Sequence, residues 1–308
     1  VEEGITDLEA IKAAGLRGVM MPGNPGTEAD YDDPMWDPFW EAAVSLGLPL
    51  SFHILTARGG GWRGPRLNSF LSIIRSIQDI MGTLVFGGVF ERHPDLRVVC
   101  VEADAGWVPH YMYRMDHAYK RHRNWLQPGV ALSRLPSEYF AEHIFVTFQD
   151  DWTAFSHAND MNWRRLMWAN DFPHSDSTWP WSQGMLAEQT AQLTAEQTRA
   201  ILSGNVADLY GIDVTALQPT AGDAVSGARP ELVIRGGTVV DGTGAGERRA
   251  DVAIVGDRIV AVGDVDLTGR REIAADGALV TPGWVDVHTH YDGQATWDQR
   301  LAPSSVHG

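Results

Sequence analysis

The stretch Leu-Pro-Leu-Ser-Phe-His-Ile, residues 48–54, predicts a short strand that is apolar on both faces and ends in a histidine. Such a strand suits the buried interior of a parallel sheet. Four similar apolar runs occur on either side of it, at Arg17–Met21, Leu96–Glu102, Ile144–Phe148 and Arg165–Ala169. Helix-like segments separate these runs, namely Trp36–Ser45, Asn68–Phe90 and Trp107–Arg121, and a last one follows at Thr194–Leu209. Strand then helix, repeated, predicts an α/β architecture with a parallel sheet.

About five such units fall within residues 1–212. A closed (β/α) barrel needs eight. The sequence therefore predicts an incomplete TIM-like barrel, formed by the C-terminal part of such a domain.

The composition of the chain excludes several classes of function. The 308 residues carry a formal net charge of -16, and no basic stripe compensates for it. This argues against nucleic acid or an anionic membrane as partner, because both bind clustered Lys and Arg. No stretch reads as a membrane span or a signal peptide, so we expect a cytoplasmic protein that acts on a small molecule, with a homo-oligomer left open. The single cysteine, Cys100, excludes a disulfide framework and is expected to be a buried core residue.

The character of the sequence changes after residue 212. Residues 213–230 are rich in Thr, Ala, Gly, Ser and Pro and predict a linker. Residues 231–281 then predict a small antiparallel β-sandwich unit, because short alternating runs are separated by glycine-rich turns. The predicted strands are Leu232–Arg235, Thr238–Val240, Asp251–Val255 and Arg258–Val262.

Residues 282–308 carry a second candidate site, the pair His288 and His290. Residues two apart on a strand point to the same face, so both imidazoles can ligate one divalent metal. Asp292 can help to orient the two imidazoles without itself binding the metal. The segment predicts the first strand of another barrel.

Two residues of the first segment stand where a parallel sheet places its catalytic groups. His53 ends its strand, and Asp171 opens the turn Asp-Phe-Pro-His after the strand at 165–169. Polar groups at strand ends face the mouth of a barrel, where an Asp can bind a metal and take a proton from water. The alternatives are a structural strand-end histidine for His53 and a helix cap or Asx turn for Asp171. For His174 a loop hydrogen bond is the favoured interpretation, and contact with substrate is the other.

Residues 231–308 closely resemble the start of the N-acyl-D-amino-acid deacylases of the amidohydrolase superfamily. The resemblance lies in Arg-Gly-Gly-Thr-Val-Val-Asp-Gly-Thr-Gly (235–244), Gly-Asp-Arg-Ile-Val-Ala-Val-Gly (256–263) and Asp-Val-His-Thr-His-Tyr-Asp-Gly-Gln (286–294). It implies that His288 and His290 are metal ligands and that the remaining ligands of that family lie downstream of Gly308.

Residues 1–212 resemble a different branch, the aminocarboxymuconate-semialdehyde decarboxylase-like enzymes. The matching stretches are the His53 strand, residues 88–99, the helix after Trp107, Asn-Asp-Phe-Pro-His (170–174) and residues 203–211. This resemblance implies that His53 and Asp171 are metal ligands, with Asp171 also a candidate base. That branch carries a histidine after the Val-Val-Cys-Val strand, where this chain has Glu102 and Asp104. Glu102 is therefore either an acid or base that faces the substrate or a salt-bridged barrel residue.

Three functional hypotheses follow. The first is a metal-dependent hydrolase, with Zn²⁺ as the expected ion and a water molecule that attacks an amide or related bond. The second is a metal-dependent decarboxylase or C–C lyase in the first segment. The third is an inactive fusion fragment or a binding module, because each segment holds only part of a metal site.

Overall fold

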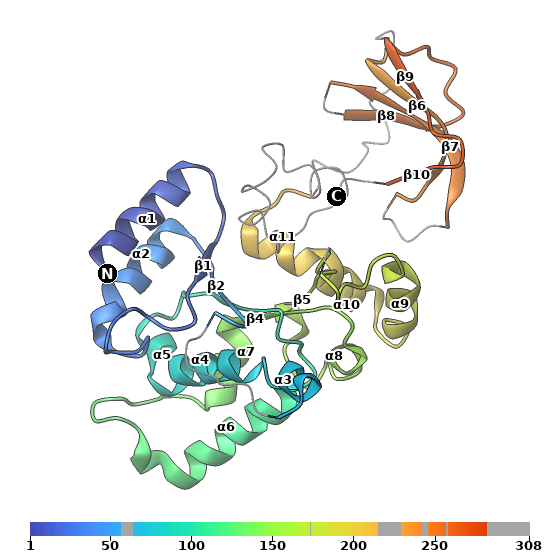
Figure 1. Ribbon diagram of the computed structural model, residues 1–308. Coiled ribbons are helices and arrows are strands. Elements are labelled where there is room, and N and C mark those ends of the chain that lie inside the picture. Colours follow the sequence, from blue (N-terminus) through green and yellow to red (C-terminus); the bar gives the residue numbers. More distant parts are fainter. Residues whose placement is uncertain (57–63, 173, 215–228, 242–245, 257, 282–308) are drawn as a thin grey trace. The chain divides into compact units, whose positions relative to one another are not determined.

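The computed structural model describes residues 1–56, 64–172, 174–214, 229–241, 246–256 and 258–281. The chain divides into two compact units, Val1–Ile212 and Asp213–Gly308. Each unit has a sheet of its own, so the two are described in turn (Figure 1).

The first unit is built on a five-stranded sheet in which all neighbouring strands are parallel. The strands lie side by side in chain order: β1 (Val19–Met21), β2 (Leu50–His53), β3 (Val98–Val101), β4 (Ile144–Phe148) and β5 (Leu166–Trp168). Each lies within the range predicted for it, so the α/β fold with a parallel sheet is confirmed. Sequential order with helices between the strands is also the arrangement of a TIM-like barrel. That the sheet belongs to an incomplete barrel stays a prediction.

The middle of this sheet shows why the strand-forming runs are apolar on both faces. Every residue of β3 and every residue of β4 is buried. Cys100 lies in β3 and is fully buried, as expected for a core thiol, and burial raises its pKa far above the usual range of a thiol.

Helices precede the first strand, connect the strands and follow the last of them. They are α1 (Glu2–Ala13), η1 (Pro34–Trp36), α2 (Asp37–Leu46), α3 (Arg66–Leu71), α4 (Arg75–Phe86), α5 (Val89–Arg92), α6 (Val108–His122), η2 (Arg123–Trp125), α7 (Pro136–His143), α8 (Trp152–Ser156), η3 (Trp163–Arg165), α9 (Ser182–Gln189), α10 (Ala195–Arg199), the π-helical turn η4 (Ala200–Gly204) and α11 (Asn205–Tyr210). The segment predicted as one helix at Asn68–Phe90 is three helices, and Gly87 and Gly88 separate the last two. Gly88 has a φ of 70°, which ends helical geometry at little cost only for glycine.

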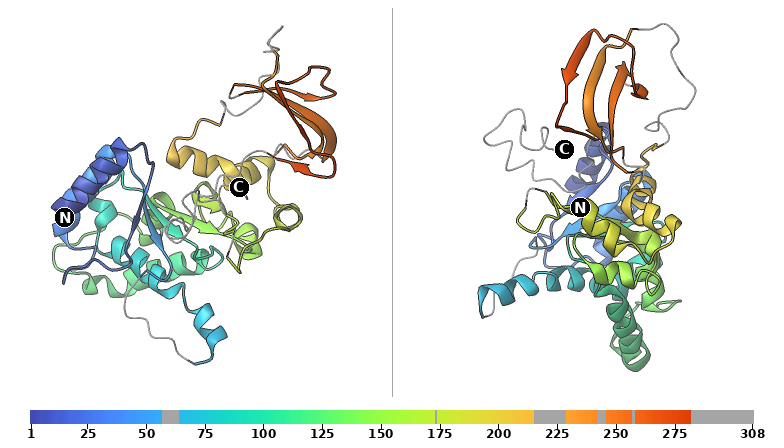
Figure 2. Two further views of the ribbon diagram at one scale, coloured as in Figure 1. Left: turned by 45° about the horizontal axis from the view of Figure 1, so that its top comes forward. Right: turned by 90° about the vertical axis from the view of Figure 1, so that its right-hand side faces the viewer.

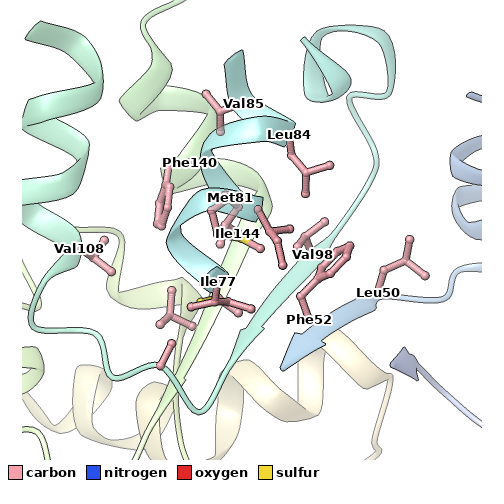
Figure 3. Packing of buried hydrophobic residues seen from close by; sticks show 14 of the residues in the cluster. Leu50, Phe52, Ile77, Met81, Leu84, Val85, Val98, Val108, Phe140 and Ile144 are labelled. Atoms are coloured by element: carbon pink, nitrogen blue, oxygen red, sulfur yellow. The ribbon is translucent and has the colours of Figure 1, made fainter. Parts of the chain in front are cut away.

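One layer of the core of the first unit lies between the sheet and α4 (Figure 3). Phe52, Val98 and Ile144 project from β2, β3 and β4, and Ile77, Met81 and Leu84 of α4 lie against them. All six side chains are at most 1% exposed. Burial of a side chain of this size stabilises the fold by roughly 1.5–3 kcal/mol, so this layer fixes α4 on the sheet.

The stretch Arg66–Phe86 corrects the expectation that no segment approaches a membrane span. Among the described residues it is the one helical stretch that is long and apolar enough to cross a membrane, with a mean hydropathy of 1.2. The test rests on length and composition only, and the stretch is divided between α3 and α4. Because α4 supplies the core layer described above, its apolar character has a structural explanation within the unit.

The second unit contains a single five-stranded sheet among its described residues (Figure 2). Its strands are β6 (Leu232–Val239), β7 (Arg248–Val255), β8 (Arg258–Gly263), β9 (Arg271–Ala274) and β10 (Leu279–Val280). β6, β7 and β8 are antiparallel neighbours, but β9 and β10 both pair parallel with β6. The predicted antiparallel sandwich is therefore wrong in detail: the sheet is mixed, because the chain after β8 returns to the free edge of β6 in the same direction.

The Gly236-Gly237 pair also has a different role from the predicted turn. β6 is one strand, and its pairing with β7 shifts register between Ile234 and Gly237. Gly236 has a φ of 67°. A Cβ at Gly237 would lie 2.4 Å from Val280 Cγ2, so the close approach of β10 also requires glycine. The pair forms a bulge within a strand. Most of the predicted linker lies outside the described residues. The predicted strand with His288 and His290 lies entirely outside them.

Candidate active site

The candidate site residues of the first unit lie at the edge of the sheet where its strands end. His53 is the last residue of β2, Glu102 directly follows β3, and Gln149 directly follows β4. Asp171 comes shortly after the end of β5. Because the strands are parallel neighbours, their carboxyl ends share one edge, which is where α/β enzymes bind their ligands.

His53 and Glu102 are in direct contact. His53 Nε2 lies 2.6 Å from Glu102 Oε2, and the other ring nitrogen, Nδ1, lies 2.5 Å from the carbonyl oxygen of Ile54. A carbonyl oxygen only accepts, so Nδ1 carries a proton and donates it in this contact. Nε2 is then the nitrogen that faces the site, an arrangement in which imidazole commonly ligates a metal.

Asp171 and His174 complete the cluster. His174 Nδ1 lies 3.2 Å from Asp171 Oδ2 and 3.8 Å from Glu102 Oε1. Glu102, Asp171 and His174 each offer one ligand atom, and these atoms lie within 4.8 Å of one another. Two ligands of one tetrahedral zinc ion stand about 3.4 Å apart. The residues therefore fit a single divalent ion, which the two carboxylates would neutralise.

His174 belongs to the cluster, although it was not among the predicted metal ligands. The predicted ligands His53 and Asp171 do lie at the same edge. Glu102 makes the ion pair stated as one alternative for it, with His53, and its role as an acid or base stays a prediction. The loop hydrogen bond expected for His174 is confirmed, because its Nδ1 lies 3.2 Å from Asp171 Oδ2. The turn between Asp171 and His174, in which the backbone N–H of His174 donates to Asp171 O at 2.9 Å, also brings the imidazole close to both carboxylates, which the sequence interpretation did not predict. The short spacing of Asp and His was the available signal.

The charges of the cluster act on one another. Burial raises the pKa of Asp171 to about 6, and the negative charge of Glu102 adds to the effect, while His174 and Gln149 oppose it. Burial by itself lowers the pKa of His53. The hydrogen bonds to Glu102 and Ile54 and the charges of Glu102 and Asp171 outweigh burial, so the pKa of His53 is raised. Two carboxylates held together in this way favour a bound cation.

The backbone at the site is strained. Among the described residues, four other than glycine have positive φ: Leu55 (64°), Glu102 (59°), Asp104 (52°) and Asp171 (57°). Such a conformation costs roughly 1–2 kcal/mol for each L-residue. All four follow the ends of strands at the same edge, and clustering of this kind is typical of functional sites.

A cavity of about 870 Å³ opens beside the cluster. Glu102, Asp104, Gln149, His174 and Asp176 lie on its polar side. Arg66, Ser69 and Ser175 add further polar groups, and the apolar lining comes from the loop after β2 and from α3 and the turn after it: Ile54, Leu55, Phe70, Leu71, Ile73 and Ile74. The volume suits a small molecule.

The family of the chain is shown by its sequence. A family profile described as amidohydrolase matches residues 5–212, more than half of the chain and nearly all of the first unit. The chain belongs to the amidohydrolase family. The superfamily is metal-dependent, in accord with the cluster of Glu102, Asp171 and His174.

Solved structures with a similar fold include decarboxylases. The structure of 5-carboxyvanillate decarboxylase LigW from Sphingomonas paucimobilis has a TM-score of 0.56 and 22% identity, over 67% of this chain and 62% of that one. A dihydroxybenzoic acid decarboxylase from Polaromonas sp. JS666, whose structure has bound manganese, has a TM-score of 0.52 and 17% identity, over 67% and 64% of the two chains. At these identities the likeness is one of fold.

A curated relative of a different kind is N-acyl-D-glutamate deacylase from Alcaligenes xylosoxydans xylosoxydans. It is 49% identical over 63 residues, which are 20% of this chain and 13% of the deacylase. This chain therefore spans only a small part of that relative. Both resemblances predicted from the sequence, to decarboxylase-like amidohydrolases and to deacylases, are confirmed.

Proposed function

We propose that the first unit is the catalytic part of a metal-dependent hydrolase that cleaves an amide or related bond of a small molecule with water. The observation that carries this proposal is the cluster of Glu102, Asp171 and His174, with atoms within 4.8 Å of one another at the carboxyl edge of an amidohydrolase sheet. His53 Nε2 reaches the same cluster through Glu102.

The four side chains would hold the ion. Mixed imidazole and carboxylate ligands suit Zn²⁺, which is our proposed metal, and they also suit Mn²⁺. Bound there, a divalent ion supplies a Lewis acid that lowers the pKa of water to about 7 and polarises a substrate oxygen.

The protein's own groups would move the proton. Asp171 accepts one proton of the attacking water at a carboxylate oxygen as the water oxygen bonds to the acyl carbon. When the C–N bond breaks, Asp171 returns that proton to the departing nitrogen. Phe70 and Leu71 line the cavity beside these groups and would hold the apolar part of the substrate away from water.

Decarboxylation is the second candidate, because the fold neighbours include two decarboxylases. The residue that follows β3 favours hydrolysis. Glu102 stands where the decarboxylase-like branch carries a histidine, as described above. The charges of the cavity do not decide between the two reactions, because Arg66 lines it together with Glu102, Asp104 and Asp176.

Metal analysis and a substrate screen test the proposal. The purified chain is loaded with Zn²⁺ or Mn²⁺, desalted and analysed by elemental mass spectrometry, then assayed with N-acyl amino acids, other amides and aromatic carboxylates. About one ion per chain and release of an amine support a hydrolase, whereas release of CO₂ supports the second candidate. Absence of stoichiometric metal would contradict both and favour the binding module or inactive fragment. Asp171→Asn should abolish turnover, and Asp95→Asn, at an exposed position, should not.

A further inference from the structure

We propose that Thr147 and Asp151 are positioning residues that hold Glu102 in its metal-binding conformation. The inference rests on the proposed metal site. Neither residue belongs to the cluster: Thr147 lies in β4 and Asp151 just before α8. Both act on the loop between β3 and α6, residues 102–107, through hydrogen bonds to its backbone.

Thr147 holds the first residue of this loop. The backbone N–H of Glu102 donates to Thr147 Oγ1 at 2.9 Å, and Thr147 is only 5% exposed. Glu102 has a φ of 59°, so its amide has left the extended geometry of β3. The hydroxyl group gives this amide a buried partner in the strained conformation.

Asp151 holds the other end of the loop. Its Oδ2 accepts from the N–H groups of Ala105 at 2.8 Å and Gly106 at 2.7 Å. Its Oδ1 accepts from Ala154 N–H at 3.0 Å and so caps α8. Asp151 is 9% exposed, and charge-assisted bonds of this kind are the strong ones. One carboxylate therefore ties the loop after β3 to the beginning of α8.

Gly106 makes this close approach possible. A Cβ on Gly106 would lie 2.9 Å from Asp151 Oδ1 and 2.7 Å from Thr153 Cβ, distances too short for real contacts. On the loop's other side, the indole N–H of Trp107 lies 2.7 Å from the carbonyl oxygen of Ala103. Residues 102–107 are thus fixed at both ends and in the middle.

The consequence concerns the carboxylate of Glu102. With φ of 59° and 52°, Glu102 and Asp104 would relax to ordinary backbone geometry if the ties were removed. Glu102 Oε2 would then leave its place beside His53 Nε2. Loss of partners that orient metal ligands typically weakens metal binding 10–100-fold.

Paired variants at Thr147 test the proposal. Metal-free full-length chains are titrated with MnCl₂ or ZnCl₂ by isothermal calorimetry. Thr147→Val has nearly the shape of threonine and suits a buried strand, but it has no hydroxyl group, so we expect the metal Kd to rise about 10–100-fold. Thr147→Ser keeps the hydroxyl group and should restore wild-type affinity. Equal affinities of Thr147→Val and the wild type would overturn the role of Thr147.

A glycine pair tests the contribution of Asp151 without changing its charge. Gly106→Ala should push the loop away from Asp151 and raise the metal Kd by a similar factor. Gly184→Ala is the matched control, because a Cβ there meets nothing within 4 Å. Melting temperatures of the metal-free chains separate loss of positioning from general destabilisation. If the residue positions Glu102, the variant binds metal more weakly than the change in its metal-free stability accounts for.

The two proposals fail in different ways. If the wild type binds neither ion, the proposed function fails and the positioning role with it. If the wild type binds an ion and neither Thr147→Val nor Gly106→Ala binds it more weakly, only the positioning role fails. Should Thr147→Val not fold, Gly106→Ala with its control decides the question.

Discussion

His53 Nε2 lies 2.6 Å from Glu102 Oε2, a contact that the sheet register places at the ends of two neighbouring strands. His53 is paired with Val101 across β2 and β3, so Glu102 stands one residue beyond the partner of His53. Because Nδ1 of His53 donates to Ile54 O, its Nε2 is turned toward the carboxylate. The charge state of His53 therefore depends on Glu102.

Replacing Glu102 should lower the pKa of His53. Burial lowers the pKa of His53, and the negative charge of Glu102 raises it. Glu102→Gln removes that charge, so the effect of burial is offset less. NMR titration of the His53 ring protons in metal-free protein measures the pKa, with the signal assigned from His53→Gln. Glu41→Gln, at an exposed position, is the control and should leave the pKa unchanged. An unaltered pKa in Glu102→Gln would show that the contact does not hold in solution.

Addition of a divalent metal should stabilise the first unit through His174. A ligand at about 100 times its Kd stabilises the folded state by about 2.7 kcal/mol, and EDTA should reverse the effect. His174→Asn should lose most of this gain, because its imidazole approaches both carboxylates of the cluster. His110→Asn, at an exposed position of α6, should keep it. Thermal unfolding with and without Zn²⁺ measures the difference, and an equal gain in both variants would remove His174 from the site.

How much of the site is visible in the sequence depends on the kind of geometry involved. Apolar runs that end in His53 or Glu102 identify the ends of strands. Because neighbouring strands are parallel, those ends can be predicted to lie together from the sequence alone. The place of His174 depends on a turn after Asp171, and Asp171 itself has a φ of 57° that no residue pattern reveals. The hydrogen bonds that Thr147 and Asp151 accept cannot be predicted from the sequence either, because their donors are backbone amides of another segment.

The second unit shows the same limit. Glycine pairs predict a break in a strand, but Gly236 and Gly237 permit either a hairpin turn or a bulge, and only the pairing with β7 decides between them. Tertiary packing also decides that β9 and β10 pair with β6. Alternation of apolar residues therefore predicts strands here but not their directions.

Replacing Asp104 should stabilise the metal-free protein above neutral pH. Asp104 is an exposed residue, but partial desolvation of its carboxyl group and the charges of nearby carboxylates, Asp151 first among them, raise its pKa from 3.8 to about 6. As pH rises from about 4 to 6 the unfolded chain ionises this group first, so the folded state loses stability in that window. Asp104→Asn removes the loss. In urea unfolding its advantage over the wild type should widen from about pH 4.5 to about pH 7.5. An advantage that does not change with pH would contradict this origin, and Asp95→Asn should show none.

Two leucines in the stretch Arg66–Phe86 should differ sharply in their effect on stability. Leu84 of α4 lies against the sheet (Figure 3) and is fully buried. Leu67 of α3 is 83% exposed. Leu84→Ala should cost about 2–5 kcal/mol, because the layer around it cannot fully close the cavity that the change leaves. Leu67→Ala should stay within about 0.5 kcal/mol of the wild type. Urea unfolding followed by far-UV circular dichroism measures both, since the helices of the described residues all lie in the first unit. Similar losses in the two variants would contradict the role of α4 as a core helix and leave the apolar character of the stretch unexplained.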